Sequence, residues 1–246
     1  FENYQTLDGR TLFLGAFFFT IQIYGDFSGY SDIAIGCARL FGIDLMQNFK
    51  YPYFSRDIAE FWRRWHISLT TWFRDYIYIP LGGSRAGKWK SFRNTLVIFL
   101  VSGFWHGANW TFVAWGAYHA LLFLPLLLLG QNRRYRDSVA ENSFLPSVKE
   151  LTQMGATFLL VLLGWILFRS EDISQAAVYL ERMFNVSLFS APQLVGLGFG
   201  QLLLKKCFFF TALMFVVEWI GRKQAHGLMI EDLSLPVRYV IYTVLL

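Results

Sequence analysis

The chain has 246 residues, of which 55% are hydrophobic, 19% are aromatic and only 16% are charged. Soluble domains carry about a quarter charged residues, so this composition, with a mean hydropathy of +0.39, disfavours a soluble domain and predicts a membrane protein. The net charge is +5, but the basic residues lie in loops between apolar runs. We therefore expect no nucleic-acid partner.

The first apolar stretch, residues 11–43, is long enough for one and a half membrane spans. Its middle, residues 24–32, is polar and rich in glycine, which predicts two helices that meet at a turn or one broken helix. Asp26 and Asp32 lie in this part, and a buried carboxylate needs a charged partner or solvent. A polar network that fixes the helix is favoured over direct catalysis. The candidate partners are Arg39, Arg63 and Arg64.

Residues 44–93 form a different kind of segment, with nine Lys and Arg residues. Ser55 follows a turn at Pro52 and is expected to cap a helix that begins near Arg56. This helix, which is predicted to run to Asp75, is amphipathic and too charged to cross lipid. We expect it to be partly buried at membrane depth, where polar structure is tolerated against other helices or a water-filled cavity.

Further spans are expected at residues 94–105, 110–129, 151–168, 207–220 and 235–246. The basic 44–93 segment is then cytoplasmic, and so are the basic loops at 131–136 and 221–223, whereas the acidic stretch 170–203 is external. This arrangement obeys the positive-inside rule and predicts a multi-pass protein. The chain starts at Phe1 and ends within an apolar run, so we expect it to be part of a longer protein.

Histidines are the main candidates for chemistry. His106 follows an apolar helix and precedes Gly107, and a titratable side chain near membrane depth is a functional hypothesis by default. Histidine suits general acid–base catalysis near neutral pH, although an interfacial histidine that faces lipid headgroups is the alternative. His66 can line the same cavity from the amphipathic helix. His119 is a supporting candidate, or a structural histidine hydrogen-bonded between helices.

Other kinds of site have little support in the sequence. There is no HExxH motif, no CxxC pair and no Gly-x-Ser-x-Gly elbow, so we predict neither a metal site nor a serine nucleophile. There is also no inverted pair of broken helices, which weakens the interpretation as a secondary transporter. A non-catalytic transport or scaffold protein remains the alternative from a different class.

Five sequence blocks follow one another in an order that resembles a known family. They are Tyr24-Gly-Asp-Phe-Ser-Gly-Tyr-Ser-Asp-Ile-Ala-Ile-Gly36, Asn48-Phe-Lys-Tyr-Pro-Tyr53, Glu60-Phe-Trp-Arg-Arg-Trp-His-Ile-Ser-Leu69, Trp72-Phe-Arg-Asp-Tyr-Ile-Tyr-Ile-Pro-Leu-Gly-Gly83 and Phe104-Trp-His-Gly-Ala-Asn-Trp110. The chain looks like a membrane-bound O-acyltransferase (MBOAT), most closely of the bacterial alginate O-acetyltransferase branch. The resemblance is densest over residues 24–120, within a single partial domain of residues 1–246.

The resemblance implies an all-α polytopic membrane protein, with a bundle of tilted helices around a tunnel. It matches the family's catalytic histidine to His106 and its second signature position to His66. It also implies an acyl thioester donor such as acetyl-CoA, a polysaccharide acceptor, a periplasmic partner protein of the acetyltransferase or esterase type, and the bacterial inner membrane. No cofactor is expected. Supporting candidates within or beside the matched blocks are Trp105, Asn109, Arg63, Arg64, Asp75 and His119.

These expectations describe a simple reaction. A thioester is already activated, so His106 needs only to remove the proton of the acceptor hydroxyl while the oxyanion is stabilised. His66 orients His106 or the acyl carbonyl. Arg63, Arg64 and Arg74 can attract an anionic donor, or they can simply reflect the positive-inside rule. Within the same architecture, the alternative is a D-alanyl transferase that acts on teichoic acids with a carrier protein as its donor.

Overall fold

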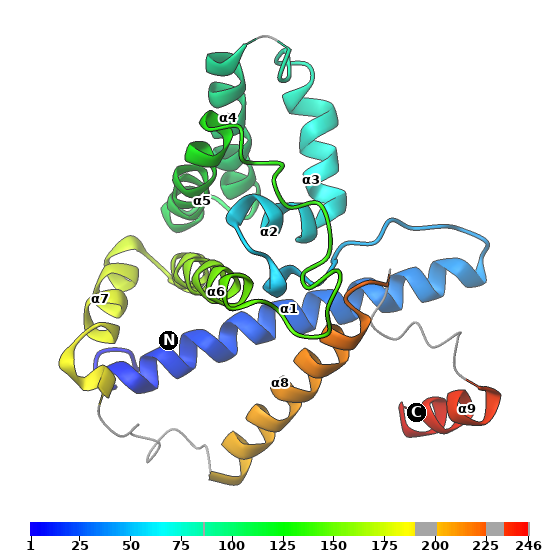
Figure 1. Cartoon of the computed structure of the whole chain (residues 1–246). Coiled ribbons are helices and arrows are strands. Elements are labelled where there is room, and N and C mark those ends of the chain that lie inside the picture. The colour runs from blue at the N-terminus through cyan, green and yellow to red at the C-terminus, as the bar shows by residue number, and fades with distance from the viewer. Residues whose placement is uncertain (86, 190–200, 225–233, 246) are drawn as a thin grey trace.

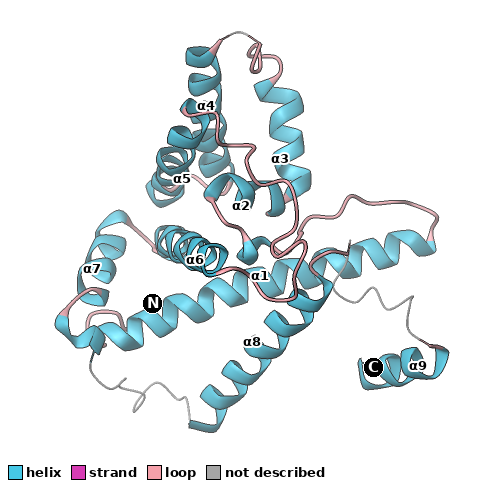
Figure 2. Cartoon of the chain, viewed as in Figure 1, coloured by secondary structure: helices cyan, strands magenta, loops and turns pink. Residues whose placement is uncertain are grey.

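The computed structural model describes residues 1–85, 87–189, 201–224 and 234–245, and every regular element in these ranges is helical (Figure 2). The predicted all-α class is therefore confirmed. Figure 1 shows the arrangement. The α-helices are α1 (Gly9–Leu40), α2 (Ile58–Arg64), α3 (Ile67–Phe73), α4 (Lys88–Trp105), α5 (Trp110–Leu128), α6 (Val148–Arg169), α7 (Ile173–Met183), α8 (Gln201–Gly221) and α9 (Leu235–Leu245), and the short elements are η1 (Pro52–Phe54), η2 (Arg74–Tyr78) and η3 (Val186–Phe189).

Helix α1 corrects the first prediction, because it is neither broken nor divided by a turn. It begins after Asp8, whose side chain accepts a hydrogen bond from the Thr11 backbone N–H, and continues for 32 residues. The glycines in its middle do not interrupt it, since a single glycine lowers the stability of a helix only modestly and the helix hydrogen bonds outweigh this loss. Its second half extends beyond most of the other helices (Figure 1), and there the side chains of Asp26 and Asp32 are exposed.

The predicted amphipathic helix is divided into α2 and α3, which meet at His66. Asp57, not Ser55, is the N-cap of α2, and its side chain accepts a hydrogen bond from the Glu60 backbone N–H. His66 adopts a left-handed backbone conformation, with φ 45° and ψ 55°. Because that conformation cannot continue a right-handed helix, α3 starts in a new direction. The chain then passes into η2, a single π-helical turn.

Helices α4 and α5 form a tightly packed hairpin. A Cβ atom on Gly103 would lie 2.3 Å from the carbonyl oxygen of Phe112, and one on Gly116 would lie 2.2 Å from that of Phe99. Only glycine allows backbones to approach this closely. The hairpin begins at Lys88, six residues before the predicted start of the span at residue 94. The close crossing fixes the turn that carries His106.

A buried ion network attaches α2 to the loop between α5 and α6. Glu60, only 1% exposed, accepts hydrogen bonds from Arg56 at 3.0 Å and from Arg64 at 2.7 Å. Both arginines also donate to the carbonyl oxygen of Asp137, at 2.9 and 3.0 Å. Arg63 donates to the carbonyl oxygens of Asn132 and Tyr135 in the same loop. Arg63 and Arg64 therefore bind the α5–α6 loop and Glu60. They do not pair with Asp26 or Asp32, so the sequence-based prediction of that pairing is wrong.

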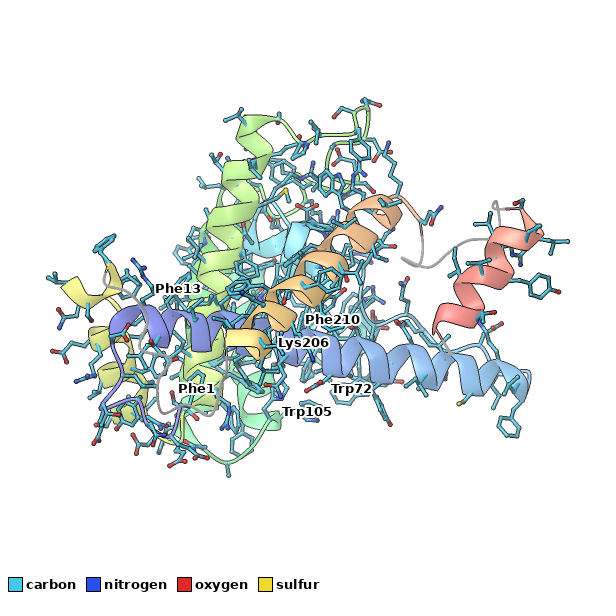
Figure 3. All side chains as sticks on the ribbon, turned by 90° about the horizontal axis from the view of Figure 1, so that it is seen from below. Phe1, Phe13, Trp72, Trp105, Lys206 and Phe210 are labelled. Carbon is cyan, nitrogen blue, oxygen red and sulfur yellow. The ribbon has the colours of Figure 1, made fainter. Side chains whose placement is uncertain are left out.

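Helix α8 lies against α1, and it crosses in front of α1 in the view of Figure 3. The Tyr24 hydroxyl donates a hydrogen bond to Glu218 of α8. The ring of Phe208 in α8 stacks on Phe17 of α1 and packs edge-on against Phe18. Helix α8 starts six residues before the predicted span at 207–220 and includes the exposed Lys205 and Lys206. Part of the expected external stretch, residues 190–200, lies outside the described residues.

Within the described residues, two helices are long and apolar enough to cross a membrane, namely α5 and α6. Their bounds agree closely with the predicted spans at 110–129 and 151–168. The side and direction of each span stay predictions.

Candidate active site

A cavity of about 600 Å³ lies among α1 to α6. Its wall is mostly aromatic and aliphatic, with Trp62, Trp65, Trp115, Trp165 and Phe168 among the large side chains. The wall also carries several hydroxyl side chains, two histidines and a few basic and amide side chains. The histidines of the wall are His66 and His106, and the basic and amide residues are Arg63, Arg74, Asn132 and Arg133.

His106 reaches the cavity from the turn after α4. Its ring is half-buried and packs edge-on against three aromatic rings, with centroid separations of 4.9 Å to Trp105, 5.3 Å to Trp115 and 4.9 Å to Phe168. No described residue hydrogen-bonds either imidazole nitrogen. The aromatic surroundings therefore fix the ring while its nitrogens stay available to a ligand in the cavity.

His66 reaches the same cavity from the break between α2 and α3. Its ring packs edge-on against Phe27 of α1, at 4.7 Å, and lies 6.2 Å from the ring of Trp105. No described residue hydrogen-bonds its imidazole. The two histidines are forty positions apart in the sequence, and both line the cavity because the break between α2 and α3 lies beside the end of α4. They do not hydrogen-bond each other.

The supporting candidates fall mostly outside the cavity wall. Trp105 is 57% exposed and contacts both histidines without lining the cavity itself. The side-chain oxygen of Asn109 caps α5 and its amide donates to the Glu171 carbonyl oxygen at 2.7 Å, which ties the turn of His106 to the start of α7. Both residues therefore position the turn rather than face the cavity.

His119 lies behind the wall, fully buried between α5 and α6. Its ring is perpendicular to that of Trp62 at 4.9 Å, and neither ring nitrogen has a hydrogen-bond partner among the described residues. The predicted structural alternative, a histidine hydrogen-bonded between helices, therefore fits its location but not its contacts. Gly164 of α6 is needed beside it, because a Cβ there would lie 2.6 Å from Nε2.

The charged candidates also differ from one another. Arg63 lines the cavity, although its guanidinium is hydrogen-bonded to the α5–α6 loop. Arg64 is absent from the wall and pairs with Glu60. Asp75 is exposed and accepts hydrogen bonds from Arg74, which lowers the pKa of this carboxyl below its usual value. Among the described residues, no cluster of three or more His, Cys, Asp or Glu side chains is placed to hold a metal ion.

Three residues at this site, Arg133, Asn48 and Ser102, were not predicted from the sequence to belong to it. Arg133 contributes to the cavity wall from the α5–α6 loop, where it was counted only as a positive-inside residue. Asn48 accepts hydrogen bonds from the backbone N–H groups of Ile67 and Ser68, which directly follow His66. Ser102 of α4 lies in the cavity wall, as His106 does. Their positions in the sequence gave no signal, because the site combines residues from several elements that are separate in the chain.

The sequence of the chain matches a known protein family. The model of the MBOAT, membrane-bound O-acyltransferase family, matches residues 3–139, which are 137 of the 246 residues and include both cavity histidines. The chain therefore belongs to the membrane-bound O-acyltransferase family, and it is a membrane protein.

Several curated proteins are similar to the chain. It is 43% identical over 196 residues to a probable alginate O-acetylase of Pseudomonas aeruginosa. The aligned region covers 78% of this chain and 36% of the relative. It is 36% identical over 187 residues to a peptidoglycan O-acetyltransferase of Helicobacter pylori, covering 76% of this chain and 34% of the relative. A teichoic acid D-alanyltransferase of Streptococcus thermophilus is 40% identical over 108 residues, which cover 41% of this chain and 26% of the relative. The chain spans about a third of the length of the first two relatives.

Proposed function

We propose that the protein transfers an acetyl group from a cytoplasmic thioester, such as acetyl-CoA, to hydroxyl groups of an exported polysaccharide. The observation that carries this proposal is the position of His106, whose unpaired imidazole lines an aromatic cavity together with that of His66. Alginate and peptidoglycan O-acetylases among the relatives support the reaction class and the glycan acceptor. The place of action is the bacterial inner membrane, which the chain crosses several times.

In the proposed reaction, the acceptor oxygen first adds to the thioester carbon, and the thiolate is then eliminated, both within the cavity. As the acceptor oxygen attacks the thioester carbon, a nitrogen of His106 takes the hydroxyl proton. The C–S bond of the resulting tetrahedral oxyanion then breaks, and the thiolate leaves with the proton that His106 returns. The aromatic wall excludes the water that would otherwise hydrolyse the donor, and it strengthens electrostatic interactions inside the cavity.

His66 has a separate role in this proposal. Because it does not hydrogen-bond His106, it does not orient that ring directly. An imidazole N–H on another part of the same wall can instead donate to the acyl carbonyl oxygen and stabilise the oxyanion. We propose that the donor and the acceptor enter from opposite ends of a tunnel of which this cavity is a part. A periplasmic acetyltransferase-like partner can accept the acyl group in place of the glycan.

The cavity wall contains basic residues that suit an anionic donor. Arg64 is occupied by Glu60, and Arg63 is hydrogen-bonded to the loop. Arg133 and Arg74 remain on the wall, and no described residue forms an ion pair with Arg133. Of the three arginines that the sequence suggested, we keep Arg74, whose ion pair with Asp75 is exposed. We therefore assign the attraction of a phosphate-bearing donor to Arg74 and Arg133.

The test is the full-length protein in its native membrane with His106 replaced by Ala or Gln. Polysaccharide O-acetylation should fall by about two to four orders of magnitude, the usual contribution of a general base. The matched control is Phe104→Ala, because Phe104 is 64% exposed and lies outside the cavity wall two residues away. Normal acetylation in a correctly inserted His106→Ala variant would refute the proposed acyl transfer at His106 and would favour a transport or scaffold role.

The donor is tested separately, since a teichoic acid D-alanyltransferase is also similar to part of the chain. Membranes that contain the protein are supplied either with acetyl-CoA or with a carrier protein charged with D-alanine. Transfer from acetyl-CoA alone is the expected result. Transfer from the charged carrier alone would replace the acetyl proposal with D-alanylation.

A further inference from the structure

The backbone at His66 needs an explanation, because a non-glycine residue rarely adopts φ 45° and ψ 55°. Such a conformation is retained only where the surrounding structure imposes it. His66 is also the N-cap residue of α3, yet its side chain makes no capping hydrogen bond. The first N–H groups of a helix have no partner within the helix, so another group must supply one.

The backbone of residues 48–50 forms hydrogen bonds with the chain both before and after this turn. The Asn48 carbonyl oxygen accepts a hydrogen bond from the Ile67 N–H at 2.9 Å, one residue after His66. The Lys50 N–H donates to the Arg64 carbonyl oxygen at 3.0 Å, two residues before it. The left-handed turn is thus held by two hydrogen bonds to a segment that lies far from α3 in the sequence.

The side chain of Asn48 supplies the missing cap. Its oxygen accepts hydrogen bonds from the Ser68 backbone N–H at 3.3 Å and from the Ser68 hydroxyl at 2.5 Å. Its amide nitrogen donates to the Ser31 hydroxyl of α1 at 3.3 Å. An N-cap side chain normally bonds the N–H two or three residues on, which is the position of Ser68 relative to His66. Asn48 therefore performs, from another segment, the capping that residue 66 would otherwise perform.

We propose that Asn48 is the positioning residue of His66. By capping α3 in place of residue 66, Asn48 releases the imidazole from a local hydrogen bond and holds it in the cavity wall against Phe27. Asn48 does not line the cavity, so it acts through His66 and not on the substrate. The catalytic consequence rests on the acyl transfer proposed above, whereas the placement of the ring does not.

The placement is tested by chemistry that needs no turnover. The full-length protein in membranes is treated with diethyl pyrocarbonate, which modifies accessible imidazoles, and the modification rates of His66 and His106 are compared by mass spectrometry. Asn48→Ala should change the rate at His66 relative to that at His106, which serves as an internal reference. Ser31→Ala, which removes only the anchor to α1, should leave the ratio close to that of the wild type. An unchanged ratio in Asn48→Ala would overturn the proposal.

The catalytic consequence is tested by a double-mutant cycle. Asn48→Ala should lower kcat for transfer from acetyl-CoA by about tenfold to a hundredfold, as expected for a misplaced group, with little change in KM. Asn48→Asp, which keeps an acceptor for Ser68, should restore part of the loss. In a His66→Gly background, Asn48→Ala should cost little more, because there is no ring to place. An equal loss in both backgrounds would show a merely structural role.

The two proposals fail in different ways. If His106→Ala keeps full acetylation while the labelling ratio at His66 still responds to Asn48→Ala, the function is wrong and the positioning holds. If His106→Ala is inactive but neither the labelling ratio nor the double-mutant cycle couples Asn48 to His66, the function holds and the positioning role is wrong.

Discussion

His66 and His106 lie in the wall of one cavity and contact the same indole ring, that of Trp105, with centroid separations of 6.2 and 4.9 Å. One histidine comes from a break between two short helices and the other from a tight turn between two long ones. Each placement depends on a backbone feature, which is a left-handed turn at His66 and a close helix crossing before His106.

The left-handed turn at His66 predicts an inverted order of stability between two substitutions. His66→Gly should be more stable than His66→Ala by about 1 kcal/mol, because a Cβ is disfavoured in this backbone region, whereas glycine is the less stable residue in ordinary helical positions. Both variants should lose acyl transfer to a similar extent. Thermal unfolding in detergent measures the order, and a more stable Ala variant would contradict the left-handed turn.

The buried network around Glu60 predicts a large structural effect outside the cavity. Glu60→Ala leaves Arg56 and Arg64 without their shared buried carboxylate, and breaking a buried ion pair in this way costs about 3–5 kcal/mol. The free energy of unfolding and the amount of inserted protein should both fall. Asp75→Asn is the matched control, because the Arg74–Asp75 pair is exposed on both sides and should leave stability unchanged. Equal effects of the two variants would argue against the network.

The crossing of α4 and α5 predicts that a single methyl group displaces the turn of His106. Gly116→Ala places a Cβ against the Phe99 carbonyl oxygen, and such overpacking typically costs about 1–3 kcal/mol. Because backbone must move, activity should fall together with stability. Gly155→Ala in α6 is the control, since its Cβ would meet nothing within 4 Å and alanine favours the helix. A Gly116→Ala variant with unchanged melting temperature would contradict the close crossing.

The presence of Arg133 in the cavity wall predicts an effect on donor affinity and little effect on kcat. Arg133→Ala should raise KM for acetyl-CoA several-fold with little change in kcat, and the difference from the wild type should shrink at high salt as charges are screened. Arg134→Ala is the matched control, because this neighbour lies outside the cavity wall and packs over Tyr135. A larger effect from Arg134 than from Arg133 would move the donor site away from this wall.

The sequence predicted much of the secondary structure correctly. The bounds of α5 and α6 follow from their apolar length, because a segment that must bury its backbone polar groups in lipid has only the helix available. It was wrong about the course of α1 and about the unbroken amphipathic helix. In α1, the glycines and polar residues suggested a helix break that is absent. In residues 56–75, a regular amphipathic pattern suggested one continuous helix, although the chain breaks at His66. The break between α2 and α3 depends on tertiary hydrogen bonds that Asn48 accepts from the backbone N–H groups of Ile67 and Ser68.

The sequence by itself determined the kind of protein and the residue types available for chemistry, since composition and a histidine beside an apolar helix are local properties. Only the tertiary structure decided which charged and polar groups face the cavity. Arg64 is used by Glu60 and His119 is sealed behind the wall, while Arg133 lines it. The reason is physical: a side chain's partners and its access to a ligand depend on elements that pack from elsewhere in the chain, and spacing along the sequence carries no record of that packing.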